Sequence, residues 1–192
     1  MADGVAAETQ ARHQPSMLAV GTVVWLASEL MFFGGLFAAY FTLKAEARVW
    51  PPRGVELETF LSAVFTLFLI ASSGTMVLAV RARERGDRAW MARWLVLTIA
   101  LGAMFLANQL REFISLDFGV STNSYGSIYY LMTGFHALHV AAGLLLMVIL
   151  LVVVSGPGPL ARRAPVTEAV GYYWHFVDVV WIGLFTTIFI IR

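Results

Sequence analysis

The sequence has 192 residues, of which 59% are hydrophobic and only 13% are charged. Soluble domains carry about 25% charged residues, so this composition indicates a membrane protein and leaves no polar segment long enough for a soluble catalytic domain. The net charge of +1 provides no basic surface for nucleic acid, and the lack of cysteine excludes disulfides, iron–sulfur clusters and thiolate metal sites.

The chain divides into a polar tail, residues 1–16, and a single membrane domain, residues 17–192. The first apolar run is about 27 residues long, which is too long for the apolar core of a cleaved signal, so it is expected to be a retained span. Hydropathy predicts an all-α integral membrane protein, a bundle of transmembrane helices at 17–43, 59–80, 90–110, 128–154 and 169–191.

The basic residues predict the orientation of this bundle. One side carries Arg12, Arg81, Arg83, Arg85, Arg88, Arg93, Arg162 and Arg163, and the other carries Lys44, Arg48, Arg53, Arg111 and Arg192. Because short cytoplasmic loops are enriched in Lys and Arg, we expect the N-terminus in the cytoplasm and the C-terminus outside.

The first span contains an acid and a run of small residues. Glu29 lies roughly 18 Å along the helix from Met17, at about 1.5 Å per residue. An intramembrane acid is a functional hypothesis by default, and the alternative is a protonated, hydrogen-bonded side chain with a structural role only. Gly34, Gly35 and Ala38 have the spacing that permits close helix contact.

The fourth span organises the rest of the chain. Tyr129, Met132, His136, His139 and Gly143 are spaced three or four residues apart, which places them on one helical face. Ionisable groups are costly in hydrocarbon, so this face is expected to meet protein, with Gly143 at a helix contact. Because the first and fourth spans run in opposite directions, Glu29 is predicted to lie near the two histidines, directly or through water.

Further polar residues lie in the third and fifth spans. Glu112 and Arg111 are near the outer end of the third span, where most charges are interfacial and Arg can reach the headgroups. His175 and Asp178 share a face of the fifth span, as a local pair or as a polar patch for a partner subunit or a lipid headgroup. Three aromatic residues are predicted as interface anchors: Trp50, Trp174 and Trp181.

A metal site and a channel are two alternatives that the residues raise. His136, His139, His175 and the glutamates offer ligand atoms, but the chain has H-A-L-H where a zinc protease has H-E-x-x-H, so no bound metal is expected. A proton or ion channel would use Glu29, His136 and His139 as a relay.

Several segments together resemble subunit III of the haem–copper oxidases, specifically cytochrome c oxidase. The resemblance is carried by SELMFFGGLFAAYF (28–41), WPP (50–52), NQLREF (108–113), YGSIYYLMTGFHALHV (125–140) and YYWHFVDVVW (172–181). These motifs follow the family's order from the first span to the last. The combination of GFHALHV with WHFVDVVW is specific to that family.

The resemblance implies a bacterial plasma-membrane subunit without a redox centre of its own. Haem and copper would be held by partner subunits I and II, with subunit I as the main contact. The chain would bind structural phospholipid, support proton uptake and protect the active site during turnover. Glu29 matches the family's buried, carbodiimide-reactive carboxylate, and the other internal polar positions match at Glu112, His136, His139, His175 and Asp178.

The resemblance leaves some points open. The partner complex is alternatively a quinol oxidase or a nitric oxide reductase, and it can include small accessory subunits or a respiratory supercomplex. Longer family members have two more helices before the first span, so their lipid-filled cleft would here be either open or completed by another subunit. Arg111 replaces a residue that is often uncharged, which suggests an ion pair with Glu112 or a partner, and Ala137 replaces a frequent glycine.

Overall fold

The computed structural model describes residues 17–52, 54–55 and 57–191, so the predicted polar tail lies outside the described residues. Five helices in this part of the chain are long and apolar enough to cross a membrane. They are α2 (Met17–Glu46), α3 (Thr59–Glu84), α4 (Arg88–Ser115), α5 (Ser124–Ser155) and α6 (Ala164–Phe185). A 3-10 turn (Leu160–Arg163) precedes α6, and a π-helical turn (Thr186–Ile190) follows it. The prediction of an all-α chain with five long apolar helices is confirmed.

The helices extend beyond the predicted spans because their ends are polar. Helix α3, the second predicted span, ends at Glu84 rather than Val80. Helix α4 begins after the N-cap Asp87, whose carboxylate accepts a hydrogen bond from the backbone N–H of Trp90 at 3.0 Å. Helix α5 begins after Asn123, which accepts from Gly126 N–H at 2.7 Å. Hydropathy detects only the apolar centre of a span, whereas capping side chains fix where the helix starts.

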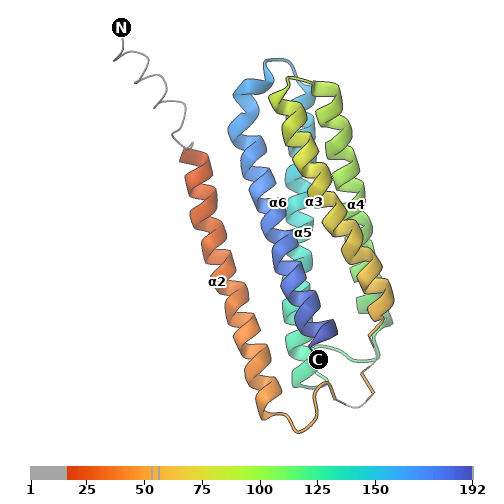
Figure 1. The fold of residues 1–192 in the computed structure, drawn as a ribbon. Helices are drawn as coiled ribbons and strands as arrows, with labels where there is room; N and C mark the ends of the chain where they lie inside the picture. The colour runs from red at the N-terminus through yellow and green to blue at the C-terminus, as the bar shows by residue number, and fades with distance from the viewer. Residues whose placement is uncertain (1–16, 53, 56, 192) are drawn as a thin grey trace.

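The helices form an up-and-down bundle with α2 at one edge (Figure 1). Helices α3 and α4 form an antiparallel hairpin, and α6 packs against α2, α3 and α5. The two arginine-containing connections, between α3 and α4 and between α5 and α6, lie at the end where α2 begins (Figure 1). This arrangement agrees with the alternation of basic residues on which the orientation was predicted.

The core of the bundle is centred on two tryptophans of α6. Trp174 and Trp181 are fully buried, and their indole N–H groups donate to Ser72 Oγ and Thr66 Oγ1 of α3, each at 2.9 Å. Both had been predicted at the lipid interface, and that prediction is wrong. The interface rule applies to tryptophans at the ends of spans, whereas these two lie inside the bundle with α3 hydroxyls as partners.

Glycine provides the space that Trp174 occupies. A Cβ atom on Gly143 of α5 would lie 2.8 Å from the Trp174 ring, and one on Gly102 of α4 would lie 2.7 Å from it. The benzene part of the indole is therefore held between the backbones of two helices. Gly143, which was predicted at a helix contact, has the Trp174 ring as its neighbour.

The small residues of α2 do not make the predicted contact within this chain. Gly34, Gly35 and Ala38 are exposed, and a Cβ on either glycine would have no neighbour within 4 Å. Phe33 and Tyr40 are the large α2 side chains that are buried in the described structure. Because successive helical residues are rotated by about 100°, Gly34 and Gly35 point away from the face that Phe33 occupies.

Candidate functional site

A carboxyl–imidazole pair joins α2 to α5. Glu29 Oε2 lies 3.2 Å from His139 Nε2, and both side chains are mostly buried, with 23% and 16% exposed. The prediction that Glu29 lies near the histidine face is confirmed by this direct contact. His139 Nδ1 lies 2.7 Å from the carbonyl oxygen of Phe135, which can only accept a hydrogen bond, so Nδ1 carries a proton.

This geometry places one further proton between the two side chains. With Nδ1 protonated, the contact is either a carboxylic acid donating to neutral Nε2 or an imidazolium N–H donating to a carboxylate. Both arrangements hold the same number of protons and differ only in which atom carries the shared one. The shared proton can therefore move from one side chain to the other without changing the hydrogen-bond pattern.

Aromatic side chains surround the pair. The Phe33 ring meets the His139 ring edge-on at 5.2 Å, and Trp25 stacks on Tyr173 at 5.3 Å. The Tyr173 hydroxyl donates to the carbonyl oxygen of His139 at 2.9 Å. Beside them is an open groove of about 370 Å³, which has mostly apolar walls. Its lining is Trp25, Phe135, Leu138, His139, Ala142, Leu145, Leu146 and Tyr173.

His136 lies apart from this contact. It is fully buried, stacks on Trp181 at 4.9 Å and meets the ring of Phe105 edge-on. Neither ring nitrogen has a hydrogen-bond partner in the described part of the chain. Glu29 is hydrogen-bonded to His139 and not to His136, so the structure gives the two histidines different surroundings.

Glu112 belongs to a second polar cluster, inside the bundle. It is 4% exposed and accepts hydrogen bonds from Ser62 Oγ at 3.3 Å and from the Tyr129 hydroxyl at 3.2 Å. Arg111 is exposed and pairs with Glu58 at 2.6 Å. The suggested Arg111–Glu112 pair is therefore wrong. Adjacent helical residues point in directions about 100° apart, so one enters the bundle and the other leaves it.

The proposed His175–Asp178 pair is also wrong. His175 Nδ1 instead lies 2.6 Å from Ser73 Oγ of α3, and Asp178 is buried without a hydrogen bond to His175. The three-residue spacing places His175 and Asp178 on one helical face. It could not reveal that the hydroxyl of Ser73, on α3, would bond the His175 imidazole instead. Trp50, predicted at the interface, is half-buried between the rings of Tyr40 and Tyr125.

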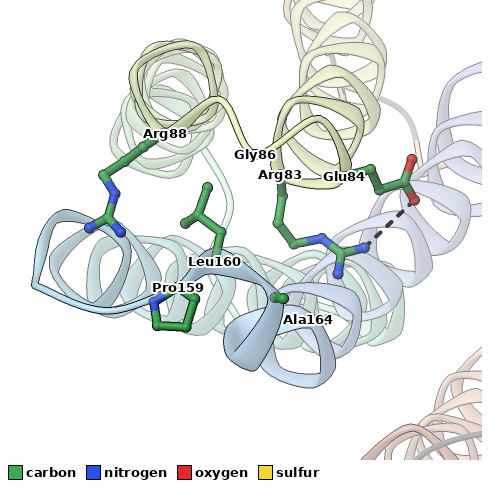
Figure 2. A pocket seen from close by; sticks show the side chains of 8 residues that line it. Arg83, Glu84, Gly86, Arg88, Pro159, Leu160 and Ala164 are labelled. Carbon is green, nitrogen blue, oxygen red and sulfur yellow. Dashed lines mark ion pairs between the residues drawn. The ribbon is translucent and has the colours of Figure 1, made fainter.

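The arginines at the other end of the bundle bind main-chain oxygens and acids. Figure 2 shows Arg83 and Arg88 on either side of Leu160, around an open pocket of about 450 Å³. Arg88 donates to the carbonyl oxygens of Val154, Gly156 and Gly158. Arg83 pairs with Glu168 at 3.2 Å and Glu84 at 3.6 Å. Sequence reasoning had assigned these arginines only to orientation and missed their role in joining the connections.

No three His, Cys, Asp or Glu side chains gather as a metal site would require in residues 17–52, 54–55 and 57–191. The fold and its polar groups define a class: a multi-pass membrane protein that holds ionisable side chains between its helices.

Sequence comparison identifies the family. The family model described as "Cytochrome c oxidase subunit III" matches residues 5–191. A "Probable cytochrome c oxidase subunit 3" of Nocardia farcinica is 45% identical over 184 residues, which are 94% of this chain and 91% of the relative. The "Cytochrome c oxidase subunit 3" of Corynebacterium diphtheriae is 46% identical over 188 residues, 95% of this chain and 92% of the relative. That of Thermostichus vulcanus is 40% identical, over 94% of this chain and 90% of the relative.

This chain belongs to the cytochrome c oxidase subunit III family, which confirms the resemblance. It is a multi-pass membrane subunit of the cytochrome c oxidase complex, and members of this family lack a catalytic centre of their own. Membership also implies subunits I and II as partners in the complex.

Proposed function

We propose that this subunit supports proton uptake by the oxidase and protects it from inactivation during turnover, through the Glu29–His139 pair. The observation that carries the proposal is the 3.2 Å contact between Glu29 Oε2 and His139 Nε2, with His139 also lining an apolar groove. A carboxyl and an imidazole that share one proton carry no net charge together, so the pair can hold this proton in hydrocarbon without an unpaired charge.

The groove beside the pair supports a role in phospholipid binding. Its walls are mostly apolar, and it lies between α2, α5 and α6, where an acyl chain can pack on Leu138, Leu145 and Leu146. An acyl chain there would cover His139 and exclude water from the apolar side of the pair. Lower local polarity strengthens the hydrogen bond that holds the shared proton.

The remaining assignments follow from the family and from charge. Subunit I is the proposed main contact of this chain. Haem and copper are proposed to be held by the partner subunits. Small accessory subunits or a respiratory supercomplex are proposed to extend the assembly. The named relatives are cytochrome c oxidase subunits, which favours cytochrome c over quinol as the donor of the complex. The larger number of basic residues at the end carrying Arg81–Arg88 supports a cytoplasmic N-terminus and an external C-terminus.

The test is Glu29→Gln in the assembled oxidase. Glutamine keeps the size and a hydrogen bond to His139, but it cannot carry the shared proton. We expect normal haem absorbance, fewer turnovers before inactivation and slower proton uptake. Glu58→Gln, an exposed acid paired with Arg111, is the matched control and is expected to behave as wild type. Loss of haem, or a wild-type number of turnovers with unchanged uptake, would contradict the proposal.

A further inference from the structure

A buried acid on the α3–α6 side of the bundle has no role in the function proposed above. The Asp178 side chain is 4% exposed, and neither carboxyl oxygen has a partner in hydrogen-bond geometry among the described residues. It lies about 21 Å along α6 from Ala164, at 1.5 Å per residue, which is well inside the hydrocarbon. A carboxyl at this depth without a fixed partner requires an explanation, because such groups are costly in membranes.

Two polar side chains lie between Asp178 and the end of the bundle that carries the arginines. Ser73 Oγ is 2.6 Å from His175 Nδ1, and Asp178 follows His175 by three residues on the same face of α6, which is the face that Ser73 meets. A serine hydroxyl both donates and accepts, and it rotates to suit either neighbour. Ser73 can therefore link the imidazole to the acid, although His175 and Asp178 do not bond to each other.

His175 opens onto a separate groove between α3 and α6. This groove has a volume of about 360 Å³, and His175 is one of its lining residues. The other lining residues lie nearer the C-terminal end of α3 and the N-terminal end of α6. Its titratable and charged members are Arg81, Arg83 and Glu84 from α3 and Glu168 and Tyr172 from α6. Charged side chains keep such an opening hydrated, so water can reach the imidazole from the surface at this end.

We infer that His175, Ser73 and Asp178 form a second proton-exchange site, which takes protons from water at the arginine-bearing end of the bundle. A proton from hydronium binds His175 Nε2, the Nδ1 proton passes to Ser73 Oγ, and the proton of that hydroxyl passes to a carboxylate oxygen of Asp178. The net change is one water and one neutral carboxylic acid. His175 is left with its proton on Nε2, and the reverse transfer restores the starting tautomer.

This site is distinct from the Glu29–His139 pair. The two differ in the helices that build them, α3 and α6 against α2 and α5, and their grooves have no lining residue in common. The inference does not depend on the proposed role of Glu29, and either can fail without the other.

Infrared difference spectroscopy of the assembled oxidase tests the inference. We expect a protonated-carboxyl band that is lost in Asp178→Asn and that shifts when H₂O is replaced by D₂O. Ser73→Ala should slow this shift at least about tenfold, because the hydroxyl relay is removed. His175→Gln is a second test, to be used also if Ser73→Ala fails to assemble. Glutamine can hydrogen-bond Ser73 but cannot relay a proton, so this variant should slow the shift to a similar extent.

Two controls separate this result from other effects. Thr75→Ala removes a hydroxyl from the same helix that bonds Thr98 of α4, and it should leave the exchange rate unchanged. Glu29→Gln should also leave the Asp178 band and its exchange unchanged. Absence of an Asp178-dependent band, or exchange at the wild-type rate in both Ser73→Ala and His175→Gln, would overturn the inference.

Discussion

Helix α2 and the bundle of α3 to α6 are built in different ways. Only 11% of the most apolar stretch of α2 is buried within the chain, against 56% of the most apolar stretch of Leu160–Ile190, which contains α6. Helix α6 is fixed by buried tryptophans that bond α3 and fill the space above glycines of α4 and α5. Helix α2 is attached by Phe33, Tyr40 and a few polar contacts, among them the Glu29–His139 pair.

The same difference separates Glu112, inside the bundle, from Glu29, the acid proposed to carry a shared proton. Inside the bundle, Glu112 accepts two hydrogen bonds from neighbouring helices and is closed off from the surface. At the α2 edge, Glu29 has one histidine partner beside an open groove. An acid that must gain and lose a proton is better placed at a loosely packed edge, because its movement there disturbs few other contacts.

The largest expected effect comes from filling the Trp174 site. Gly143→Leu places new atoms where the indole lies, and overpacking of this kind costs roughly 1–3 kcal/mol or more. We expect this subunit to be lost from the oxidase during purification, as measured by its amount relative to haem. Gly34→Leu is the matched control on α2, where a Cβ has no neighbour, and should leave the fold of this chain intact. Equal loss in both variants would contradict the assigned packing.

An intermediate effect is expected from Glu112→Ala. This change leaves the Ser62 and Tyr129 hydroxyls without their buried acceptor, at a cost of roughly 1–3 kcal/mol. The melting temperature of the subunit in the complex should fall, and Glu112→Gln, which keeps an acceptor oxygen, should recover part of the loss. An unchanged melting temperature in the alanine variant would show that these hydrogen bonds do not stabilise the bundle.

The smallest effect is expected from Tyr40→Phe on α2. It removes one 3.3 Å hydrogen bond to the carbonyl oxygen of Thr187 while the ring remains packed. The expected loss is about 0.5–1 kcal/mol, because a long neutral hydrogen bond contributes little. Thermal unfolding of the purified complex measures this change. A shift as large as that of Glu112→Ala would mean that α2 is held as firmly as the bundle.

Helix positions and the approach of Glu29 to the histidine face of α5 could be predicted from the sequence. Five long apolar runs leave few alternatives to membrane helices, and two polar groups at similar depth in antiparallel spans tend to meet. The identity of the histidine was not predictable, because His136 and His139 share a face. The difference arises from Trp181, which stacks on His136 within the bundle.

Other contacts depend on which way each helix is rotated in the bundle, and one sequence does not provide that information. Trp174 was expected at the lipid interface and Gly34 at a helix contact, and the structure reverses the two environments. His175 has a suitable partner three residues away, yet it bonds Ser73 from a helix that is distant in sequence. Helical spacing identifies residues that share a face, but not the helix that the face meets.

The way Trp174 is held has a consequence for biogenesis. Its binding site includes Ser72, Gly102 and Gly143, one residue each from α3, α4 and α5, the three helices that immediately precede α6 in the chain. None of those helices can form the site alone, so the last span can lock into place only after the three earlier ones have come together. Helix α6, which is also the last to be synthesised, is therefore the last of these four helices that can pack into its final position.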